Sequence, residues 1–343
     1  MIRYLFFVSH LYAFAIVRPL QKAIRQRGDD AAWFLNHKQH AGYLHKNEKH
    51  LKTIEEVMAY NPSAVFVASN IVPDFFPGLK VQLFHGFNAQ KREENRGHFR
   101  IRGLFDLYCT QGPSTTLPFK RLAQQHGNFE VVETGWPKMD PLFDKSISVE
   151  KRKKPVILFT STFTPSLSAA HRISDEVERL SYQDRWEWIV TFHPKMDRAV
   201  VKRFKAMQHD NLRFVDTDNV LPLLKQADVM LSDSSSIISE FLLQGRPVVT
   251  YQNRVPGPHL INVTEKNQIG PALAKALAPS SDLLKAIETY VERIHPYYDG
   301  MSSNRVLEAT TTLAQKGLDH LRKKPLNLLR KAKIRKRLHY YKL

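Results

Sequence analysis

The stretch VMLSDSSSIISEFLLQGRPVVTY, residues 229–251, contains a short apolar run, five polar residues in a row, a longer apolar run and a final apolar run after Gly-Arg-Pro. Short apolar runs bounded by turn-forming residues are typical of buried strands, and the middle run at 237–245 has helical character. Strand, helix and strand in this order predict a parallel sheet. Ligands of such sheets bind beyond the carboxyl ends of the strands, which is where Asp233, Ser234, Ser235 and Ser236 stand.

The same alternation covers most of the chain. Strands are predicted at residues 2–9, 31–36, 63–69, 80–86, 104–112 and 129–137, with a helix at 12–28 that Gly28 closes. After a polar, basic and proline-terminated linker at 143–155, strands are predicted at 156–162, 186–194, 212–216, 228–233 and 247–251, with helices between them. We therefore expect an α/β fold of two Rossmann-like, doubly wound domains facing a central cleft. The expected boundaries are 1–145 and 155–318, followed by a tail at 319–343.

Composition bounds the classes of partner. The chain has 343 residues and a net charge of +18, which indicates an acidic partner: nucleic acid, an anionic membrane or a phosphate-rich substrate. The excess is concentrated in the linker and the tail, and no motif that reads DNA or RNA is evident, so nucleic acid is not expected as a partner. The tail is typical of a basic amphipathic helix on anionic lipid; a solvated basic tail is the alternative.

The N-terminal residues 1–20 resemble a signal peptide, but His10 and Arg18 interrupt the apolar run and no small-residue cleavage site follows. No run reaches the roughly 18 to 20 apolar residues that span a bilayer. The single cysteine, Cys109, is expected to be a small core residue and suits a reducing compartment. These features predict a cytoplasmic protein, peripheral at the inner face of the cell membrane.

Candidate ligand-binding residues follow several predicted strands. Serine hydroxyls and free N–H groups at a helix start would bind a diphosphate, and Glu240, one turn further on, could accept bonds from ribose hydroxyls. Capping of the helix by Ser234 or Ser236 is the alternative. His193 and His85 each follow a strand in a different half, and Gly86 would allow close backbone approach. Lys138, at another strand end, could bind phosphate, and a solvated turn charge is its alternative. Ser161 and Thr162 also follow a strand and are candidates for the donor site, and helix capping is their alternative.

Taken in order, the segments FHG, TGWPKMDPL, ILFTSTF, FHPKMD and ADVMLSDSSSIISEFLLQGRPVV resemble the CDP-glycerol glycerophosphotransferase family, whose members build teichoic-acid-type polymers. The resemblance runs from about residue 80 to about residue 305, where YYDGMSSNRVLEA is similar to the family's closing loop and helix. It departs at FHGFNAQK, where the family usually has Trp-His-Gly-Thr-Pro, and at Ser234, where the family usually has tyrosine.

The resemblance implies a GT-B fold with the nucleotide donor on the C-terminal domain and the acceptor on the N-terminal domain. It implies that His85 and His193 are catalytic and that the donor contacts are Asp233, Ser234, Ser235, Ser236 and Glu240, together with Ser302 and Ser303. The implied donor is CDP-glycerol or a related CDP-polyol. The implied acceptor is a glycan or a polyprenyl-linked molecule.

The expected reaction transfers a polyol phosphate to an acceptor hydroxyl and releases CMP, with His85 as the base. His193 and the serines would stabilise phosphate charge, and no metal or other cofactor is required. The Asp-x-Asp at 216–218 is interpreted as a helix start capped by Asp218. A GT-B glycosyltransferase that uses a nucleotide sugar is the nearest alternative.

Overall fold

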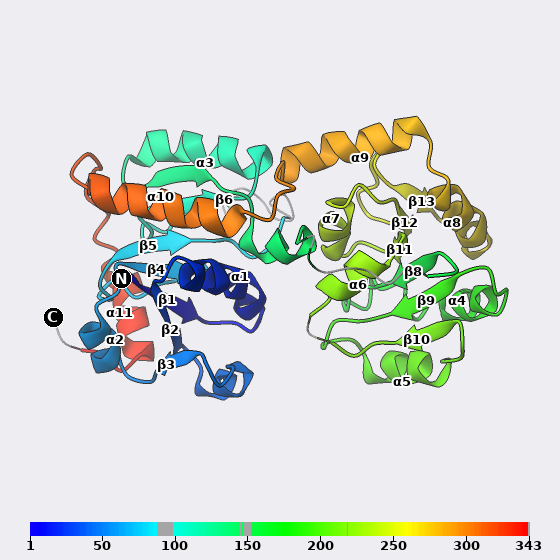
Figure 1. Ribbon diagram of the computed structural model, residues 1–343, viewed down its shortest axis with the longest axis horizontal. Helices are drawn as coiled ribbons and strands as arrows, with labels where there is room; N and C mark the ends of the chain where they lie inside the picture. Colours follow the sequence, from blue (N-terminus) through cyan, green and yellow to red (C-terminus); the bar gives the residue numbers. More distant parts are fainter. Residues whose placement is uncertain (88–98, 145, 147–151, 218, 342–343) are drawn as a thin grey trace. The chain divides into compact units, whose positions relative to one another are not determined.

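The structure is a computed structural model that describes residues 1–87, 99–144, 146, 152–217 and 219–341 (Figure 1). The chain divides into two compact units. Unit 1 comprises Met1–Phe143 and Ile294–Leu343, and unit 2 comprises Asp144–Arg293. Each unit contains one parallel sheet.

The sheet of unit 1 has seven strands in the order β3-β2-β1-β4-β5-β6-β7. Apolar residues alternate across it. The side chains of Leu5, Phe34 and Val65 belong to a core that α2, α3 and α11 complete, whereas Trp33 on the other face packs against Phe14 of α1 at a ring distance of 5.2 Å. In chain order the elements are β1 (Arg3–Val8), α1 (Tyr12–Gln26), β2 (Asp30–Leu35), η1 (Lys38–Tyr43), β3 (Lys49–Leu51), α2 (Ile54–Tyr60), β4 (Ala64–Val67), β5 (Leu79–Gln82), β6 (Leu107–Thr110), α3 (Pro113–His126), β7 (Glu130–Glu133), η2 (Pro137–Leu142), α10 (Ser302–Lys316) and α11 (Leu328–Arg337).

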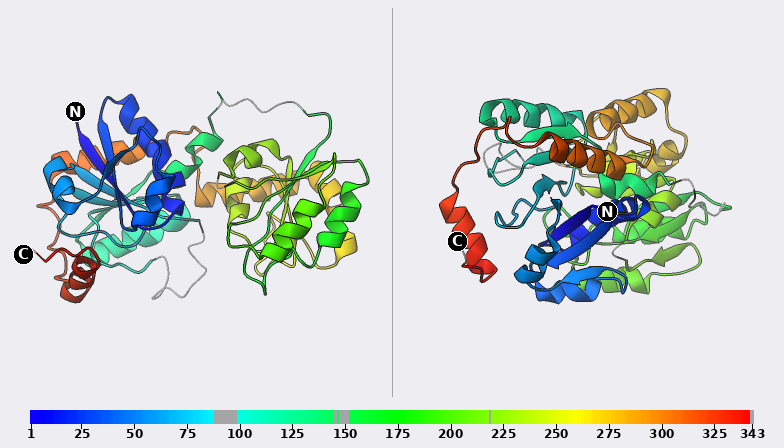
Figure 2. Two further views of the ribbon diagram at one scale, coloured as in Figure 1. Left: turned by 90° about the horizontal axis from the view of Figure 1, so that it is seen from below. Right: turned by 60° about the vertical axis from the view of Figure 1, so that its left-hand side comes forward.

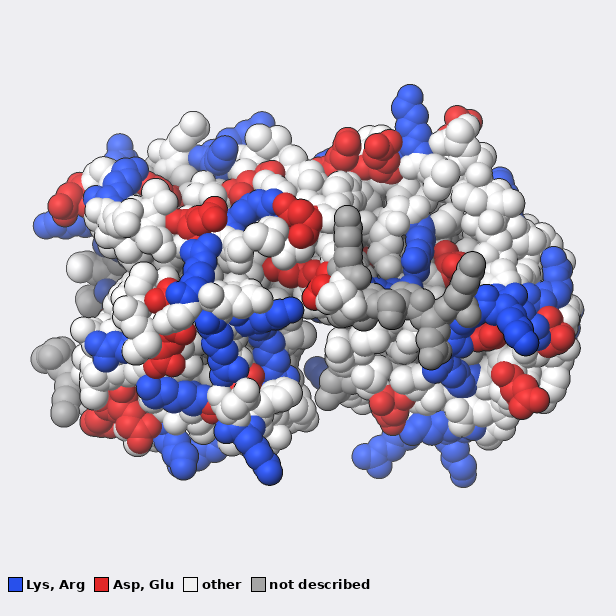
Figure 3. Space-filling view, viewed as in Figure 1, with Lys and Arg blue, Asp and Glu red and all other residues white. Residues whose placement is uncertain are grey.

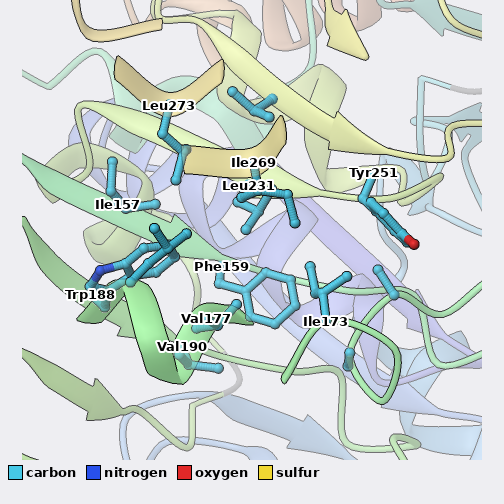
Figure 4. Packing of buried hydrophobic residues seen from close by; sticks show 14 of the residues in the cluster. Ile157, Phe159, Ile173, Val177, Trp188, Val190, Leu231, Tyr251, Ile269 and Leu273 are labelled. Carbon is cyan, nitrogen blue, oxygen red and sulfur yellow. The ribbon is translucent and has the colours of Figure 1, made fainter. Parts of the chain in front are cut away.

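Unit 2 has six strands in the order β10-β9-β8-β11-β12-β13. A hydrophobic core lies between the sheet and helices α4, α5 and α8 and includes Phe159, Trp188, Leu231 and Ile269 (Figure 4). The elements are β8 (Val156–Phe159), α4 (Ser174–Ser181), β9 (Glu187–Val190), α5 (Arg198–Ala206), β10 (Leu212–Phe214), α6 (Leu221–Gln226), β11 (Val229–Ser232), α7 (Ile237–Leu242), β12 (Val248–Tyr251), β13 (Ile261–Val263), η3 (Lys266–Gln268), α8 (Ile269–Leu277) and α9 (Ser281–Ile294).

The expected α/β class is confirmed, and both sheets have the strand order of a doubly wound Rossmann fold. The division of the chain differs from the expected boundaries 155–318 and 319–343, because Ile294–Leu343 belongs to unit 1. Helix α10 packs against α1, β5, β6 and η2, and α11 inserts Ile334 into the core of the same unit. The two ribbon views of Figure 2 show α11 beside this unit, close to the C-terminus.

The N-terminal apolar segment forms β1 and α1, so its hydrophobic side chains are used for the core of unit 1. Among the described residues, no helix combines the length and the apolar character that a membrane span needs. Cys109 is buried in β6, as expected of a core residue, and burial raises the pKa of its thiol.

Candidate functional site

In unit 2 the strand order reverses between β8 and β11. From β8 the chain proceeds to β9 and β10 on one side, and it then crosses to β11, β12 and β13 on the other. The loops that follow β8 and β11 therefore lie at the edge of the sheet where ligands of such folds bind. Ser161 and Thr162 lie in the first loop, and residues 233–236 lie in the second.

Asp233 joins these two loops. Its side chain is fully buried, and its carboxylate accepts hydrogen bonds from Ser161 Oγ (2.5 Å), the Thr162 N–H (3.1 Å) and the Ala169 N–H (3.0 Å). Ser161 Oγ also accepts from the Ala170 N–H (3.2 Å). Both side chains are thus engaged in holding the backbone of residues 160–170.

The serine run is tied to the next loop as well. Ser234 Oγ accepts from the Arg254 N–H (3.0 Å), and the Asn253 amide donates to the backbone oxygen of Asp233 (2.6 Å). Ser236 occupies the N-cap position of α7, but its side chain makes no capping hydrogen bond. The hydroxyl of Ser234 bonds a different loop, so the described structure contains no side-chain cap from either serine. Ser235 is half-buried and Ser236 is exposed.

Glu240 and His193 lie at the same end of unit 2 and differ in exposure. Glu240 is buried in the first turn of α7, with 7% of its surface exposed. His193 is exposed beyond the end of β9, and its Nδ1 accepts from the Lys195 N–H (3.1 Å). A neutral imidazole that accepts at Nδ1 carries its proton on Nε2, so Nε2 is a donor. The ring lies 4.7 Å from that of Phe163, in the loop after β8.

His85 occupies the corresponding edge of unit 1, after β5. The residue is exposed, and its ring stacks on Tyr12 at 5.3 Å. Partial desolvation, together with the positive potential of His10 and Arg102, lowers the pKa of His85 below its usual 6.5. An imidazole must be unprotonated to accept a proton, and this shift is compatible with a neutral ring at pH 7. At Gly86 a Cβ would meet no other described atom within 4 Å, so the fold itself does not require glycine there.

A cavity of about 290 Å³ opens beside His85. It lies where the strand order of unit 1 reverses, between the ends of β1 and β4. Sequence reasoning missed most of its lining, although the polar residues that follow β1, β2 and β4 carry the same strand-end signal that singled out His85. The lining residues are Ser9, His10, Tyr12, Asn36, His37, Ser69, Asn70, Ile71, His85, Arg102 and Arg337.

A larger hollow of about 460 Å³ lies along α1, away from these strand ends. Arg18 and Glu48, which line it, pair with each other at 3.1 Å. Their charges are therefore already compensated, and this hollow offers no arrangement of groups that indicates chemistry.

The remaining predicted residues lie elsewhere in unit 1. Ser302 and Ser303 are buried at the start of α10, where their N–H groups donate to the Asp140 carboxylate at 2.8 and 2.7 Å. Lys138 is half-buried in η2, and its ammonium lies 5.2 Å from the centre of the Trp136 ring. Ser302, Ser303 and Lys138 are not part of the cavity beside His85.

No group of three or more His, Cys, Asp or Glu side chains in the described part of the chain is arranged to hold a metal ion. Asp218, the predicted helix cap, lies outside the described residues. Asp216 forms an exposed ion pair with Lys205 at 2.9 Å.

Comparison with known proteins places this geometry in context. The chain is 23% identical over 194 residues to the teichoic acid glycerol-phosphate primase of Bacillus subtilis, which covers 52% of this chain and 50% of the relative. It is 26% identical over 229 residues to a teichoic acid ribitol-phosphate polymerase of Staphylococcus aureus, which covers 57% of this chain and 43% of the relative. The matched region therefore spans about half or less of the length of these curated relatives.

Solved structures show the same fold. The wall teichoic acid polymerase TagF matches with a TM-score of 0.67 at 14% identity, covering 92% of this chain and 90% of that one. The UDP-GlcNAc 2-epimerase of Neisseria meningitidis matches with a TM-score of 0.57 at 14% identity, covering 91% and 100%. The expected GT-B-like class is thereby confirmed. Residues 15–311 match the family described as CDP-Glycerol:Poly(glycerophosphate) glycerophosphotransferase, and the chain belongs to this family.

Proposed function

We propose that the protein transfers glycerol phosphate, or a similar polyol phosphate, from a CDP-linked donor to a hydroxyl of a glycan or lipid-linked acceptor and releases CMP. The family match over residues 15–311 carries the proposal. Two of the relatives are named for glycerol-phosphate and ribitol-phosphate chemistry, and TagF has also been solved with CDPG. The nucleotide-sugar alternative has no comparable support, because the epimerase shares only the fold at 14% identity.

The donor is proposed to bind unit 2 beyond β8 and β11. Ser235 and Ser236 present hydroxyls at the start of α7, and Ser234 and Thr162 contribute from partly exposed positions. Asp233 and Ser161 are buried and bonded to the backbone, so we assign them the role of holding these loops in place. Glu240 is the candidate for ribose hydroxyls.

His85 and His193 are proposed to have different roles. The lowered pKa of His85 keeps its imidazole neutral at pH 7, which suits the base that removes the proton of the acceptor hydroxyl. His193 presents Nε2–H, which suits donation to a phosphate oxygen as charge moves onto the leaving CMP. Phosphoryl transfer depends mainly on such positioning and electrostatic stabilisation. Gly86 and Lys138 remain candidates for the acceptor side, and Ser302 and Ser303 for the donor.

The test is CMP release by the purified full chain from CDP-glycerol, with CDP-ribitol and UDP-sugars in parallel and a bacterial membrane extract as acceptor. We expect His85→Gln and His193→Gln each to lower the rate by about 100-fold or more, in the range found for general acid and base groups. His126→Gln, an exposed histidine at the end of α3, is the matched control and should retain full activity. UDP release from a sugar donor without CMP release from any CDP-polyol would overturn the proposal.

The protein is also proposed to bind an anionic membrane surface from the cytoplasmic side through its C-terminal segment. Leu326, just before α11, is 73% exposed, and Leu328 and Leu329 in the first turn of α11 are 68% and 82% exposed. Lys333 and Lys336 are exposed on the same helix. Exposed leucines among lysines are typical of helices that lie in a lipid interface.

A further inference from the structure

The cavity beside His85 has an uneven charge. Arg102 and Arg337 line it together with His10, His37 and His85, and the residues described around it include no Asp or Glu. Figure 3 shows that Lys and Arg side chains elsewhere on the viewed face of unit 1 are interspersed with Asp and Glu. Two permanent cations, with no carboxylate among the described lining residues, favour an anion.

Arg337 reaches this cavity because α11 is docked on unit 1. Ile334 is 4% exposed in the core of that unit, and Arg335 pairs with Asp74 at 3.3 Å. The ring of Tyr340, just beyond the helix, stacks on Phe75 at 4.2 Å. These contacts on both sides of Arg337 in the sequence hold the last turn of α11 beside the strand ends.

The second cation, Arg102, is connected to the same helix. The backbone oxygen of Arg102 accepts hydrogen bonds from Arg330 Nη1 (2.6 Å) and from the Asn327 amide (2.9 Å). The Asn327 amide also donates to the oxygen of Gly103 (3.2 Å). The start of α11 thus fixes the segment that carries Arg102, while its end supplies Arg337.

The volume and the polar lining of the cavity limit which ligands fit it. The cavity volume of about 290 Å³ is just below the range of small-ligand sites, roughly 300 to 1,000 Å³, so the cavity suits one terminal group and not a length of polymer. Guanidinium groups match phosphate oxygens in geometry and charge, while Asn36 and Asn70 offer amides suited to hydroxyls. A neutral sugar would bring no negative charge to either arginine.

We propose that this cavity is an anion subsite that binds the phosphate of a polyol phosphate at the end of the acceptor, with Arg102 and Arg337 as its cations. The free hydroxyl of that terminal group then lies next to His85. The identity of the ligand as an acceptor rests on the proposed function, whereas phosphate binding at the cavity does not. Arg337 lies beyond residues 15–311, so this contribution comes from outside the region that the family shares.

The experiment measures binding of glycerol 3-phosphate to the full chain by calorimetry, with no donor present. We expect Arg337→Gln to weaken binding by about ten-fold and to leave the midpoint of thermal unfolding unchanged, because Arg337 is exposed. Lys336→Gln removes the same charge from the neighbouring exposed position, which does not line the cavity, and should bind like the unmodified chain. Absence of glycerol 3-phosphate binding, or equal binding by the two variants, would overturn the subsite.

A second arm separates the source of the phosphate. Vesicles of phosphatidylglycerol, with phosphatidylcholine as reference, test a lipid headgroup as the occupant. If Arg337→Gln weakens only vesicle binding and leaves glycerol 3-phosphate binding intact, the acceptor assignment is wrong. If glycerol 3-phosphate binds as expected but no CDP-polyol yields CMP, the proposed function fails and the phosphate subsite stands.

Discussion

Asp233 is a buried residue that joins two loops of unit 2. Its buried carboxylate accepts from Ser161, Thr162 and Ala169 and so fixes the loop after β8 against the loop after β11. A carboxylate with three donors is stable when buried, because its charge is hydrogen-bonded. Of the serines that follow, Ser234 is bonded to the Arg254 N–H, Ser235 is half-buried and Ser236 is exposed.

We therefore expect opposite behaviour from two serines. Ser161→Ala removes a donor to buried Asp233 and should lower the free energy of unfolding by about 1 to 3 kcal/mol. Ser236→Ala, at an exposed position, should change that free energy by less than about 0.5 kcal/mol and slow CMP release. Urea unfolding and CMP release measured on both variants check the prediction, and equal stability of the two would contradict it.

His295 predicts a pH dependence of stability. The ring is 1% exposed, its Nε2 accepts from the Trp136 N–H at 2.9 Å, and burial lowers its pKa to about 4. The unfolded chain binds a proton near pH 6.5, so stability from this group is present above that pH and is lost as the pH falls toward 4. Between pH 7 and pH 5 the loss amounts to about 2 kcal/mol.

The measurement is urea unfolding at pH 7 and pH 5 for His295→Gln and for the control His126→Gln. We expect His295→Gln to be less stable than the unmodified chain at pH 7 but to lose about 2 kcal/mol less on acidification. The control His126→Gln should lose as much stability between pH 7 and pH 5 as the unmodified chain. If His295→Gln loses as much stability between pH 7 and pH 5 as the unmodified chain, the pH dependence belongs to other groups.

Among the elements, α11 departs most from what its sequence indicates. It reads as a basic helix with scattered apolar residues, and such a pattern does not reveal which apolar residue faces protein and which faces solvent. The structure buries Ile334 at 4% exposure and leaves Leu329 at 82%. The helix is therefore partly a structural element of unit 1 and partly an exposed surface.

We expect Ile334→Ala to undock α11. Truncating a buried isoleucine costs about 2 to 5 kcal/mol, and Ile334 is the buried residue within α11. Leu329→Ala is the matched control, with an expected change of less than about 0.5 kcal/mol. Hydrogen exchange of the α11 amides measures the effect: fast exchange in Ile334→Ala alone supports the prediction, and equal protection in both variants contradicts it.

The strand and helix alternation was predictable because it depends on local periodicity, as β1, α1 and β2 illustrate. The return of Ile294–Leu343 to unit 1 was not, because it depends on contacts between distant residues. Asp140 accepts from the first N–H groups of α10, and Trp136 donates to His295. The strand-end rule selected His85 and His193 as candidates. It could not show that Ser161 and Asp233 bond to each other, since partners 72 residues apart leave no local signal.

At the scale of the whole molecule, the chain leaves unit 1, builds unit 2 and returns. The family match begins and ends in unit 1, which is consistent with α10 being part of the shared fold. The C-terminal segment beyond residue 311 adds docking contacts, the cation Arg337 and the exposed leucines. One helix thereby combines a role at the proposed acceptor cavity with a role at the proposed membrane surface.

This combination predicts how the protein binds vesicles. Each lysine or arginine near an anionic surface contributes about 1 kcal/mol, and the exposed leucines add apolar burial. The variant Leu326→Ser, Leu328→Ser, Leu329→Ser should bind phosphatidylglycerol vesicles at least about ten-fold more weakly in sedimentation and should unfold at the same temperature, since these side chains are exposed. Leu284→Ser, in α9, is the control.

Binding of the unmodified chain to these vesicles should fall steeply as salt rises, because exposed charges are screened. Salt-insensitive binding, or equal binding by variant and control, would show that this segment is not the membrane contact.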